Sequence, residues 1–245
     1  MNKAFILAGG RGTRLLPYTI VIPKPMLPID NIPVIEIIAR QLKYHGFDEV
    51  HVSLGYLSEM VRIYLESHMG DNGMPKFVFH LEEIPLGTSG PISSAGAIDS
   101  EFLVINGDIL TTLNMREMFE YHKANNAVLT IAVRQTEYQL PLGSITVDSN
   151  NRILSFEEKP KSTHLDNIGA YIYSSKALEY IPRGIKFDVN ELVDLLIKAN
   201  EKVIAFREDG PYFWIDIGTH ADYEKASIEF NRLRPFFPFL EGYAK

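Results

Sequence analysis

The chain opens with a short apolar run that ends abruptly in a glycine-rich loop. Residues 4–7 have the continuous apolar pattern of a buried strand, and residues 9–14 read GGRGTR. Such a loop presents backbone N–H groups to an anion, and glycine lets the chain approach a phosphate closely. Arg14 can bind two phosphate oxygens at once, and Lys24 adds a second cation. The segment predicts a phosphate site, with an ordinary surface turn as the alternative.

Several familiar catalytic and phosphate-binding motifs are absent from the sequence. The loop lacks the third glycine of the G-x-G-x-x-G dinucleotide fingerprint, and no Gly-Lys-Ser/Thr P-loop occurs. There is no G-x-S-x-G elbow, kinase motif set or paired-histidine metal motif. The seven histidines are scattered and are expected to be structural or on the surface. A nicotinamide-dependent oxidoreductase remains an alternative that the missing glycine counts against.

Composition restricts the partners of the chain. At 245 residues and 46% hydrophobic content, the chain can bury the core of a single α/β unit with an embedded subdomain. A net charge of −7 argues against a nucleic-acid partner and an anionic membrane surface, so phosphate binding must be built locally. Cysteine is absent, no apolar run could span a bilayer, and no signal peptide is recognisable. These features predict a soluble cytoplasmic protein.

Strands and helices alternate along the first half of the chain. This pattern predicts an α/β fold with a Rossmann-like, doubly wound, mostly parallel sheet. Helices are expected at 33–46, 58–69 (with Ser58 as N-cap), 115–125, 189–199 and 221–233, and strands at 4–7, 49–54, 76–81, 101–105, 128–133, 143–147, 153–156, 168–173 and 202–206. Ligands of such sheets bind at the carboxyl ends of the strands. Three segments follow strands there and are expected to lie close together, namely residues 9–14, 82–90 and 106–108.

Five separated segments together resemble a known family. They are the glycine-rich segment L-A-G-G-x-G-T-R-L-x-P with its following P-K-P, L-G-T-S-G at 86–90, N-G-D at 106–108, E-K-P at 158–160 and W-I-D-I-G-T at 214–219. In this order they resemble the sugar-1-phosphate nucleotidyltransferases, or nucleotide-sugar pyrophosphorylases, from Gly9 to about Ala226. The resemblance implies a GT-A-like fold and a reaction in which an NTP and a sugar 1-phosphate give an NDP-sugar and pyrophosphate.

The resemblance implies a single nucleotidyltransferase domain over residues 1–245. Residues 1–126 would form the nucleotide-binding half, and 127–245 the sugar-binding and closing half. Within the second half, an inserted β-rich subdomain is expected to form the opposite wall of the cleft.

The resemblance also assigns the charged residues. Arg14 would hold the departing phosphates, Lys24 the triphosphate and Lys159 the sugar phosphate. Asp108 and Asp216 would hold Mg²⁺, although either could instead cap a helix or a turn, and Thr219 could cap the last helix as well. The E-K-P segment could also be solvated surface.

The implied binding residues form two groups. The nucleotide group comprises Leu7, Ala8, Gly9, Gly10, Gly12, Thr13, Arg14, Lys24, Glu82, Pro85, Gly87, Thr88 and Asp108. The sugar-phosphate group comprises Asn106, Gly107, Gly143, Glu158, Lys159, Asn167 and Gly169, for which ordinary turns are the alternative. Glu82 or Glu83 could accept hydrogen bonds from guanine, which favours GTP.

The chain is similar to short members of the family, including mannose- and heptose-1-phosphate guanylyltransferases, and no appended C-terminal region is evident. The open alternatives are the same chemistry with UTP, dTTP or CTP, with another sugar phosphate or phosphocholine, and a non-catalytic nucleotide-sugar-binding homologue. The aromatic segment 235–239 is expected to pack on the protein itself or on a second subunit, so a homodimer is considered.

Overall fold

The computed structural model describes residues 2–94, 98, 100–210 and 212–240. The helices are α1 Val34–Tyr44, α2 Ser58–Ser67, α3 Met115–Asn125, α4 Val189–Lys198 and α5 His220–Leu233. The strands are β1 Asn2–Ala8, β2 Pro28–Ile29, β3 Ile32–Pro33, β4 Phe47–Leu54, β5 Lys76–Leu81, β6 Phe102–Asn106, β7 Ile109–Thr111, β8 Leu129–Gln139, β9 Ser144–Val147, β10 Ile153–Glu157, β11 Lys161–Tyr173, β12 Val203–Phe206 and β13 Trp214–Asp216.

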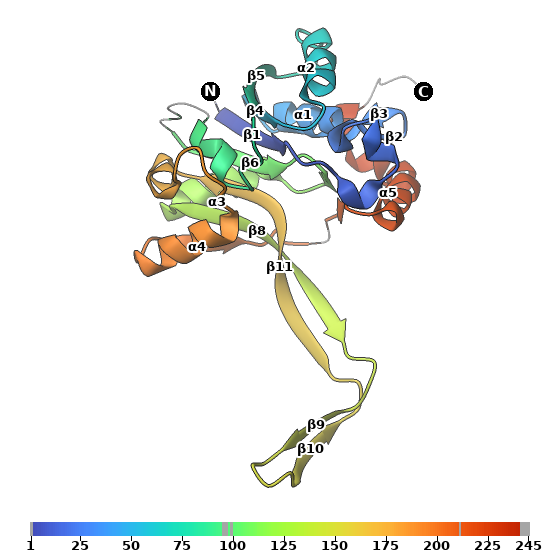
Figure 1. Cartoon of the computed structure of the whole chain (residues 1–245), viewed down its shortest axis with the longest axis vertical. Coiled ribbons are helices and arrows are strands. Elements are labelled where there is room, and N and C mark those ends of the chain that lie inside the picture. The colour runs from blue at the N-terminus through green and yellow to red at the C-terminus, as the bar shows by residue number, and fades with distance from the viewer. Residues whose placement is uncertain (1, 95–97, 99, 211, 241–245) are drawn as a thin grey trace.

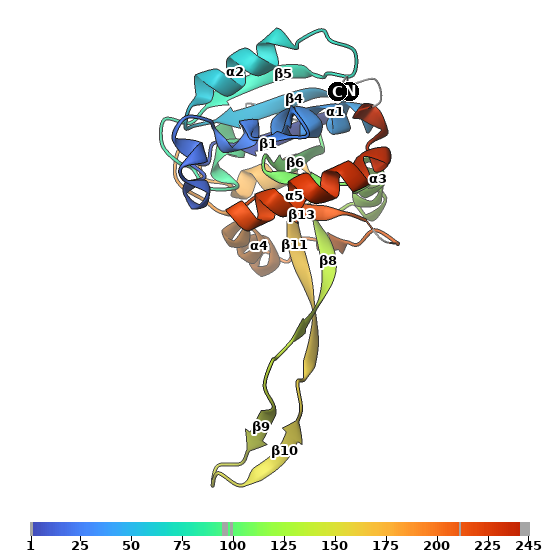
Figure 2. The same ribbon diagram turned by 90° about the vertical axis from the view of Figure 1, so that its right-hand side faces the viewer.

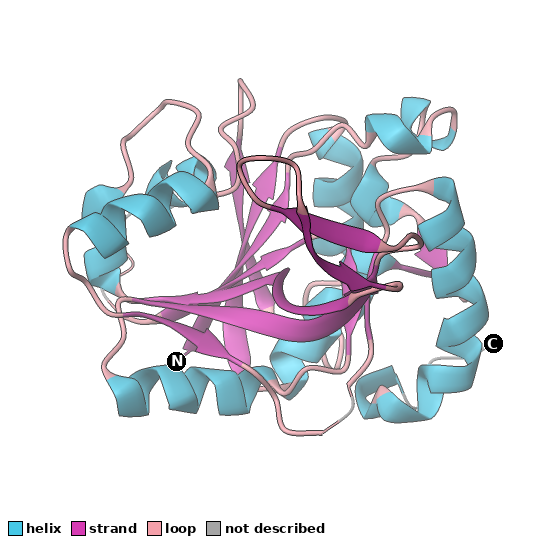
Figure 3. Cartoon of the chain, turned by 90° about the horizontal axis from the view of Figure 1, so that it is seen from below, coloured by secondary structure: helices cyan, strands magenta, loops and turns pink. Residues whose placement is uncertain are grey.

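The centre of the molecule is a seven-stranded sheet in the order β12-β8-β11-β6-β1-β4-β5. β1 lies parallel to β4 and β6, and only β11 runs antiparallel to its neighbours β6 and β8. Helices lie on both sides of the strands (Figure 3). The predicted α/β fold with a mostly parallel sheet is therefore confirmed.

The sheet is buried on both faces because side chains alternate along its central strands. In β1, Ala4 and Ile6 join one buried apolar cluster, whereas Phe5 joins a second cluster on the opposite face. This double burial explains the continuous apolar sequence of β1. The glycine-rich loop follows β1 in the chain and therefore lies at the carboxyl end of this strand.

Two helix starts differ in detail from the sequence expectation. Ser58 is not the N-cap of α2, because Leu57 occupies that position in a left-handed conformation with φ 54°. Thr219 caps α5 by accepting a hydrogen bond from the Asp222 N–H, and Asp222 returns the contact to Thr219. Since Thr219 fills this position, Asp216 does not serve as the cap.

The strands after residue 127 depart from the expected subdomain. Residues 129–133 and 168–173 lie within the main sheet, in β8 and β11, and both strands continue outward as a paired ribbon from Asn167↔Val133 to Lys161↔Gln139. The hairpin of β9 and β10 lies at the far end of this ribbon (Figures 1 and 2). The expectation that these strands form the opposite wall of the cleft is wrong for a single chain, because β8 and β11, beyond a register shift between Asn167 and Tyr171, stay paired and carry the hairpin away from the body.

The aromatic segment near the end of the described chain packs on the body. Phe237 is buried with its ring 5.1 Å from that of Phe230, and Phe239 lies 5.8 Å from the ring of Tyr44. Of the two expected roles, packing on the protein itself is confirmed for Phe237. Among the described residues, no helix is long and apolar enough to cross a membrane.

His122 of α3 is a buried titratable group that links this helix to the sheet. Its Nδ1 lies 2.7 Å from the Thr130 hydroxyl, and its Nε2 has no hydrogen-bond partner among the described residues. Burial lowers the pKa of His122 from 6.5 to about 4, and the charge of Glu101 opposes this shift without cancelling it. The imidazole is therefore neutral in the folded protein at pH 7.

This burial makes stability depend on pH. Between pH 6.5 and 4 the unfolded chain protonates His122 and the folded chain does not, so stability is full above pH 6.5 and is lost as the pH falls toward 4. Compared with His122→Asn, the wild type should lose on the order of 1–3 kcal/mol more unfolding free energy between pH 7.5 and 4.5. Denaturant titrations at both pH values measure this difference, and equal losses in the two proteins would contradict it.

Candidate active site

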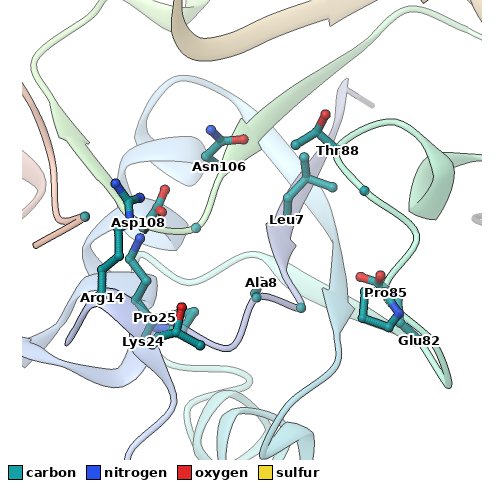
Figure 4. Close-up of a pocket in the computed structure, with 17 residues that line it drawn as sticks. Leu7, Ala8, Arg14, Lys24, Pro25, Glu82, Pro85, Thr88, Asn106 and Asp108 are labelled. Atoms are coloured by element: carbon teal, nitrogen blue, oxygen red, sulfur yellow. Dashed lines mark hydrogen bonds and ion pairs between the residues drawn. The ribbon is translucent and has the colours of Figure 1, made fainter. Parts of the chain in front are cut away.

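A cavity of about 390 Å³ opens at the carboxyl ends of the central strands (Figure 4). All 13 residues of the predicted nucleotide group line it, together with Pro25, Asn106, Gly107 and Gly218. The parallel strands explain this gathering, because β1, β5 and β6 each deliver their following loop to the same edge of the sheet. The placement of these residues agrees with the sequence analysis, and their roles remain predictions.

Gly12 shapes the first wall of the cavity. It adopts a left-handed conformation with φ 62°, and its carbonyl accepts a hydrogen bond from the Thr19 hydroxyl at 2.9 Å. A Cβ at this position would lie 2.9 Å from a Thr19 methyl group and 3.1 Å from the Lys24 Cβ. Glycine therefore lets the segment carrying Lys24 fold against the loop. A 3₁₀ turn, Thr13–Leu15, follows instead of an α-helix, which agrees with the missing dinucleotide fingerprint.

The floor of the cavity consists of closely packed backbone. The Gly107 N–H donates to the Leu7 carbonyl at 2.9 Å, and a Cβ at Gly107 would lie 2.8 Å from that oxygen. Gly55, which the sequence analysis did not single out, approaches the Gly9 carbonyl in the same way, with a Cβ-to-oxygen distance of 2.6 Å. Larger residues at these positions would displace the glycine-rich loop.

Charged side chains from three distant segments meet at one end of the cavity. The Lys24 ammonium contacts the Asp108 carboxylate and lies 3.9 Å from Asp216 Oδ1. Strand pairing brings the two aspartates together, because β13 pairs with β7 and the Ile217 N–H donates to the Asp108 carbonyl at 2.9 Å. A Cβ at Gly218 would lie 3.2 Å from both Arg14 Nη2 and Asp216 Oδ2, so the guanidinium lies at the same end.

The environment of Asp216 suits a bound cation. Burial, and secondly the charge of Asp108, raise the pKa of Asp216 above its ordinary value, whereas Lys24 and Arg14 oppose the shift. Asp216 Oδ1 is buried and has no hydrogen-bond partner among the described residues. A buried, unsatisfied carboxylate oxygen beside a second carboxylate is the type of ligand pair that Mg²⁺ uses together with phosphate oxygens. The described residues contain no cluster of three or more potential metal ligands, so substrate oxygens would have to complete the coordination.

Glu82 forms the opposite end of the cavity. Its carboxylate accepts hydrogen bonds from the Ser53 hydroxyl and, at 3.1 Å, from the Leu86 N–H. A Cβ on Gly9 would collide with the same carboxylate, so glycine is required there. Two carboxylate oxygens offer about four acceptor positions, which leaves capacity for a ligand. Glu83 is exposed and does not line the cavity.

The loop after Glu82 depends on a residue that the sequence analysis missed. Asp188, at the start of α4, accepts a hydrogen bond from the Thr88 N–H at 3.0 Å, and the Thr88 hydroxyl accepts one from the Val189 N–H at 2.8 Å. A Cβ on Gly87, which has φ 80°, would collide with the Asp188 carboxylate. The capping box of Asp188 and Glu191 was readable from the sequence, but its contact with the loop was not.

The predicted sugar-phosphate group is divided in the structure. Asn106 and Gly107 line the cavity, whereas Asn167 and Gly169 do not. Gly169 lies against the Asn106 side chain, since its Cβ would be 2.6 Å from Asn106 Nδ2, and its N–H donates to Asn167 Oδ1 at 3.0 Å. These four residues therefore lie together on the body.

The other three members of the group, Gly143, Glu158 and Lys159, lie on the projecting ribbon and do not line the cavity (Figures 1 and 2). A Cβ on Gly143 would lie 2.6 Å from the Phe156 ring and 3.2 Å from Glu158 Oε2, so Gly143 and Glu158 lie side by side on the ribbon. Lys159 is exposed and has a left-handed backbone with φ 49°. The expectation that all five charged residues surround one cavity therefore fails for Lys159 within one chain, because the β8–β11 ladder carries it outward.

Comparison with known proteins shows to which protein family the chain is similar. Residues 3–232 match the family model described as nucleotidyl transferase. A D-glycero-alpha-D-manno-heptose 1-phosphate guanylyltransferase of Aneurinibacillus thermoaerophilus is 34% identical over 232 residues, which cover 93% of this chain and 97% of that protein. A UTP–glucose-1-phosphate uridylyltransferase of Synechocystis is 32% identical over 243 residues, and the match covers 91% of this chain and 62% of the relative's length.

A solved structure is similar over nearly the same extent. HddC from Yersinia pseudotuberculosis, complexed with GMP-PN, is 32% identical with a TM-score of 0.69, and the match covers 94% of this chain and 100% of that one. Residues 3–232, which match the family model, extend from β1 to α5 and include every residue that lines the cavity. The chain therefore belongs to the nucleotidyl transferase family.

Proposed function

We propose that this protein condenses an NTP, preferably GTP, with a mannose- or heptose-type sugar 1-phosphate to give an NDP-sugar and pyrophosphate. The observation that carries the proposal is the meeting of Arg14, Lys24, Asp108 and Asp216 beside a glycine-rich loop. An acidic chain gathers cations at one edge of its sheet, as a reaction between two phosphates requires. The guanylyltransferase relatives support the choice of GTP, and the uridylyltransferase relative supports UTP with glucose 1-phosphate as the second candidate.

The proposed chemistry is an in-line displacement. An oxygen of the sugar phosphate forms a bond to the α-phosphorus, and the bond from that phosphorus to the bridging oxygen breaks, so that pyrophosphate leaves with the electron pair. Little proton transfer is needed, and the protein contributes mainly by positioning and by neutralising charge. Lys24 would bind the triphosphate and Arg14 the departing phosphates, while backbone N–H groups of the loop hold phosphate oxygens.

Asp108 and Asp216 would hold the divalent cation, which the unsatisfied Asp216 oxygen suits. When bound, Mg²⁺ supplies charge neutralisation for phosphate oxygens of both substrates. The two carboxylates also position Lys24, which contacts one and lies near the other. A cytoplasmic location is part of the proposal, since soluble nucleotides are its substrates.

Asp108→Asn tests the proposed charge arrangement. Loss of this carboxylate charge should lower kcat/KM by about a hundredfold or more, because one preorganised charge contact contributes ~3–4 kcal/mol to the barrier. Pyrophosphate release from GTP and mannose 1-phosphate is the measurement. Asp48→Asn, which changes a partly exposed aspartate paired with Lys43 outside the cavity, is the matched control and should retain full activity. Near-wild-type turnover of Asp108→Asn would refute the assignment.

The base preference is tested at Glu82. The Glu82 carboxylate would accept hydrogen bonds from the N1–H and exocyclic amine of guanine. In Glu82→Gln the side-chain NH2 group, a donor, would face one of these donors. The preference for GTP over UTP should therefore fall by about tenfold or more. The ratio of kcat/KM values for the two nucleotides is the measurement. Glu83→Gln is the control, because Glu83 is exposed and outside the cavity. An unchanged ratio in Glu82→Gln would assign base recognition elsewhere.

A further inference from the structure

The projecting ribbon is an unusual element for a folded protein. It consists of residues 134–166, which comprise the outer ends of β8 and β11 together with β9 and β10, and we refer to it as the arm (Figure 2). Lys159 is separated from Asn167, on the body, by eight residues of extended chain, or about 26 Å. An isolated two-stranded hairpin is only marginally stable in water, so the arm needs a surface to pack on.

The arm is also strongly apolar. Large hydrophobic side chains are at least half exposed along it, namely Tyr138, Leu140, Leu142, Ile145, Val147, Ile153, Leu154, Phe156 and Leu165. At about 100 Å² each, these nine would present on the order of 900 Å² per copy, similar to the ~800 Å² per partner of a standard protein interface. Monomeric proteins rarely expose contiguous apolar patches of more than about a few hundred Å², so this concentration of exposed apolar side chains on one projecting element indicates an interaction surface.

The cavity on the body lacks charge that its proposed substrates require. Arg14 and Lys24 are the only Lys or Arg side chains among its described lining residues, and Lys24 already contacts Asp108. With Glu82 and the nearby Asp216, carboxylates outnumber cations around the cavity. One divalent cation does not balance a triphosphate and a second phosphate, so the proposed reaction calls for a further cation.

Lys159 of the arm is a candidate for this further cation. Lys159 is exposed, and no ion pair to it exists among the described residues, whereas neighbouring Lys161 pairs with Glu137 at 2.9 Å. The left-handed backbone at Lys159 is an uncommon conformation for a residue with a side chain, and such conformations concentrate at functional sites. The Lys159 carbonyl is fixed by Gln139, whose side-chain amide donates to it at 3.3 Å.

We propose that the arm of each chain packs over the cavity of a second copy, where its Lys159 binds the sugar phosphate. The active site is then composite, with Asp108 and the nucleotide-binding loops from one chain and Lys159 with Glu158 from the other. This inference rests on the proposed function, and the role of Lys159 is the one that the family resemblance implies. In a two-fold symmetric dimer both arms are packed at once, because the arm of each chain covers the cavity of the other.

Two features favour a second copy over the chain's own cavity. The arm extends away from its own cavity (Figures 1 and 2), and its pairing runs from Asn167↔Val133 to Lys161↔Gln139 without a shift, so Lys159 would reach its own cavity only if the whole arm bent back at the register shift between Asn167 and Tyr171. The body also has a strip of exposed apolar side chains between Arg14 and Lys24, formed by Leu16, Tyr18, Ile20 and Val21. This strip adjoins the cavity and can receive the apolar face of an incoming arm.

Light scattering tests the interface without any enzymatic readout. The wild type should have the mass of a dimer, and Leu142→Asp combined with Leu154→Asp should give a monomer, because both side chains are more than 60% exposed on the arm. Ile63→Asp, at a side chain 59% exposed on α2, is the matched control and should remain dimeric. A monomeric wild type at micromolar concentration would overturn the proposal.

Hybrid dimers test which chain supplies Lys159. Chains carrying Lys159→Ala and Asp108→Asn are co-expressed with different affinity tags and purified through both tags. Each variant alone should fall to about 1% of wild-type turnover or less. In a swapped hybrid, the intact arm meets the intact cavity at one of the two sites, so about half of the wild-type turnover returns. A hybrid as inactive as its parents means that Lys159 acts within its own chain.

Cross-linking tests which chain supplies Lys159 without measuring turnover. The chain has no cysteine of its own, so introduced cysteines react selectively. Lys159→Cys on one chain and Pro85→Cys on the other should be joined by a flexible bismaleimide into a covalent heterodimer, whereas Ile63→Cys in place of Pro85→Cys should not. A cross-link formed only when both cysteines are on one chain would overturn the proposal. An interchain cross-link between these variants, together with a wild-type protein that releases no pyrophosphate, would instead reject the proposed reaction and retain the swapped arm.

Discussion

The contact between Lys24 and Asp108, with Asp216 beside them, is the interaction around which the cavity is organised. A lysine ammonium held between two carboxylates keeps three charged groups at the edge of a mostly apolar sheet. Each group comes from a different part of the chain, so their meeting requires the correct order and register of β1, β6, β7 and β13. Asp216 Oδ1, at 3.9 Å from the Lys24 ammonium, has no hydrogen-bond partner among the described residues, which is the feature that suits a divalent cation.

Close backbone packing makes this arrangement possible. Gly107 lets the segment after β6 approach the end of β1, and Gly12 lets the segment with Lys24 fold back over the loop. The glycines therefore act through shape as much as through the N–H groups that they offer to phosphate. The charged residues could not converge if side chains filled these positions.

Division of the predicted sugar-phosphate group connects the architecture of the chain with its assembly. The body holds the predicted nucleotide residues in a preformed cavity, whereas the arm holds Lys159 and a row of exposed apolar side chains. Under the composite-site proposal, dimer formation and completion of the active site are one event. Hydrophobic burial of the arm would then supply the free energy that positions a charged residue.

The sequence by itself determined the alternation of strands and helices, the sheet class and the segments that reach its carboxyl edge. These properties are local, because apolar periodicity and turn residues are written in consecutive positions, and parallel connectivity then places the loops together. Tertiary structure alone decided the proximity of Asp108 and Asp216, the contact of Asp188 with the Thr88 loop and the direction of the arm. Residues far apart in sequence make these contacts, and no local pattern encodes whether a long ribbon such as β8 and β11 returns to the body or leaves it.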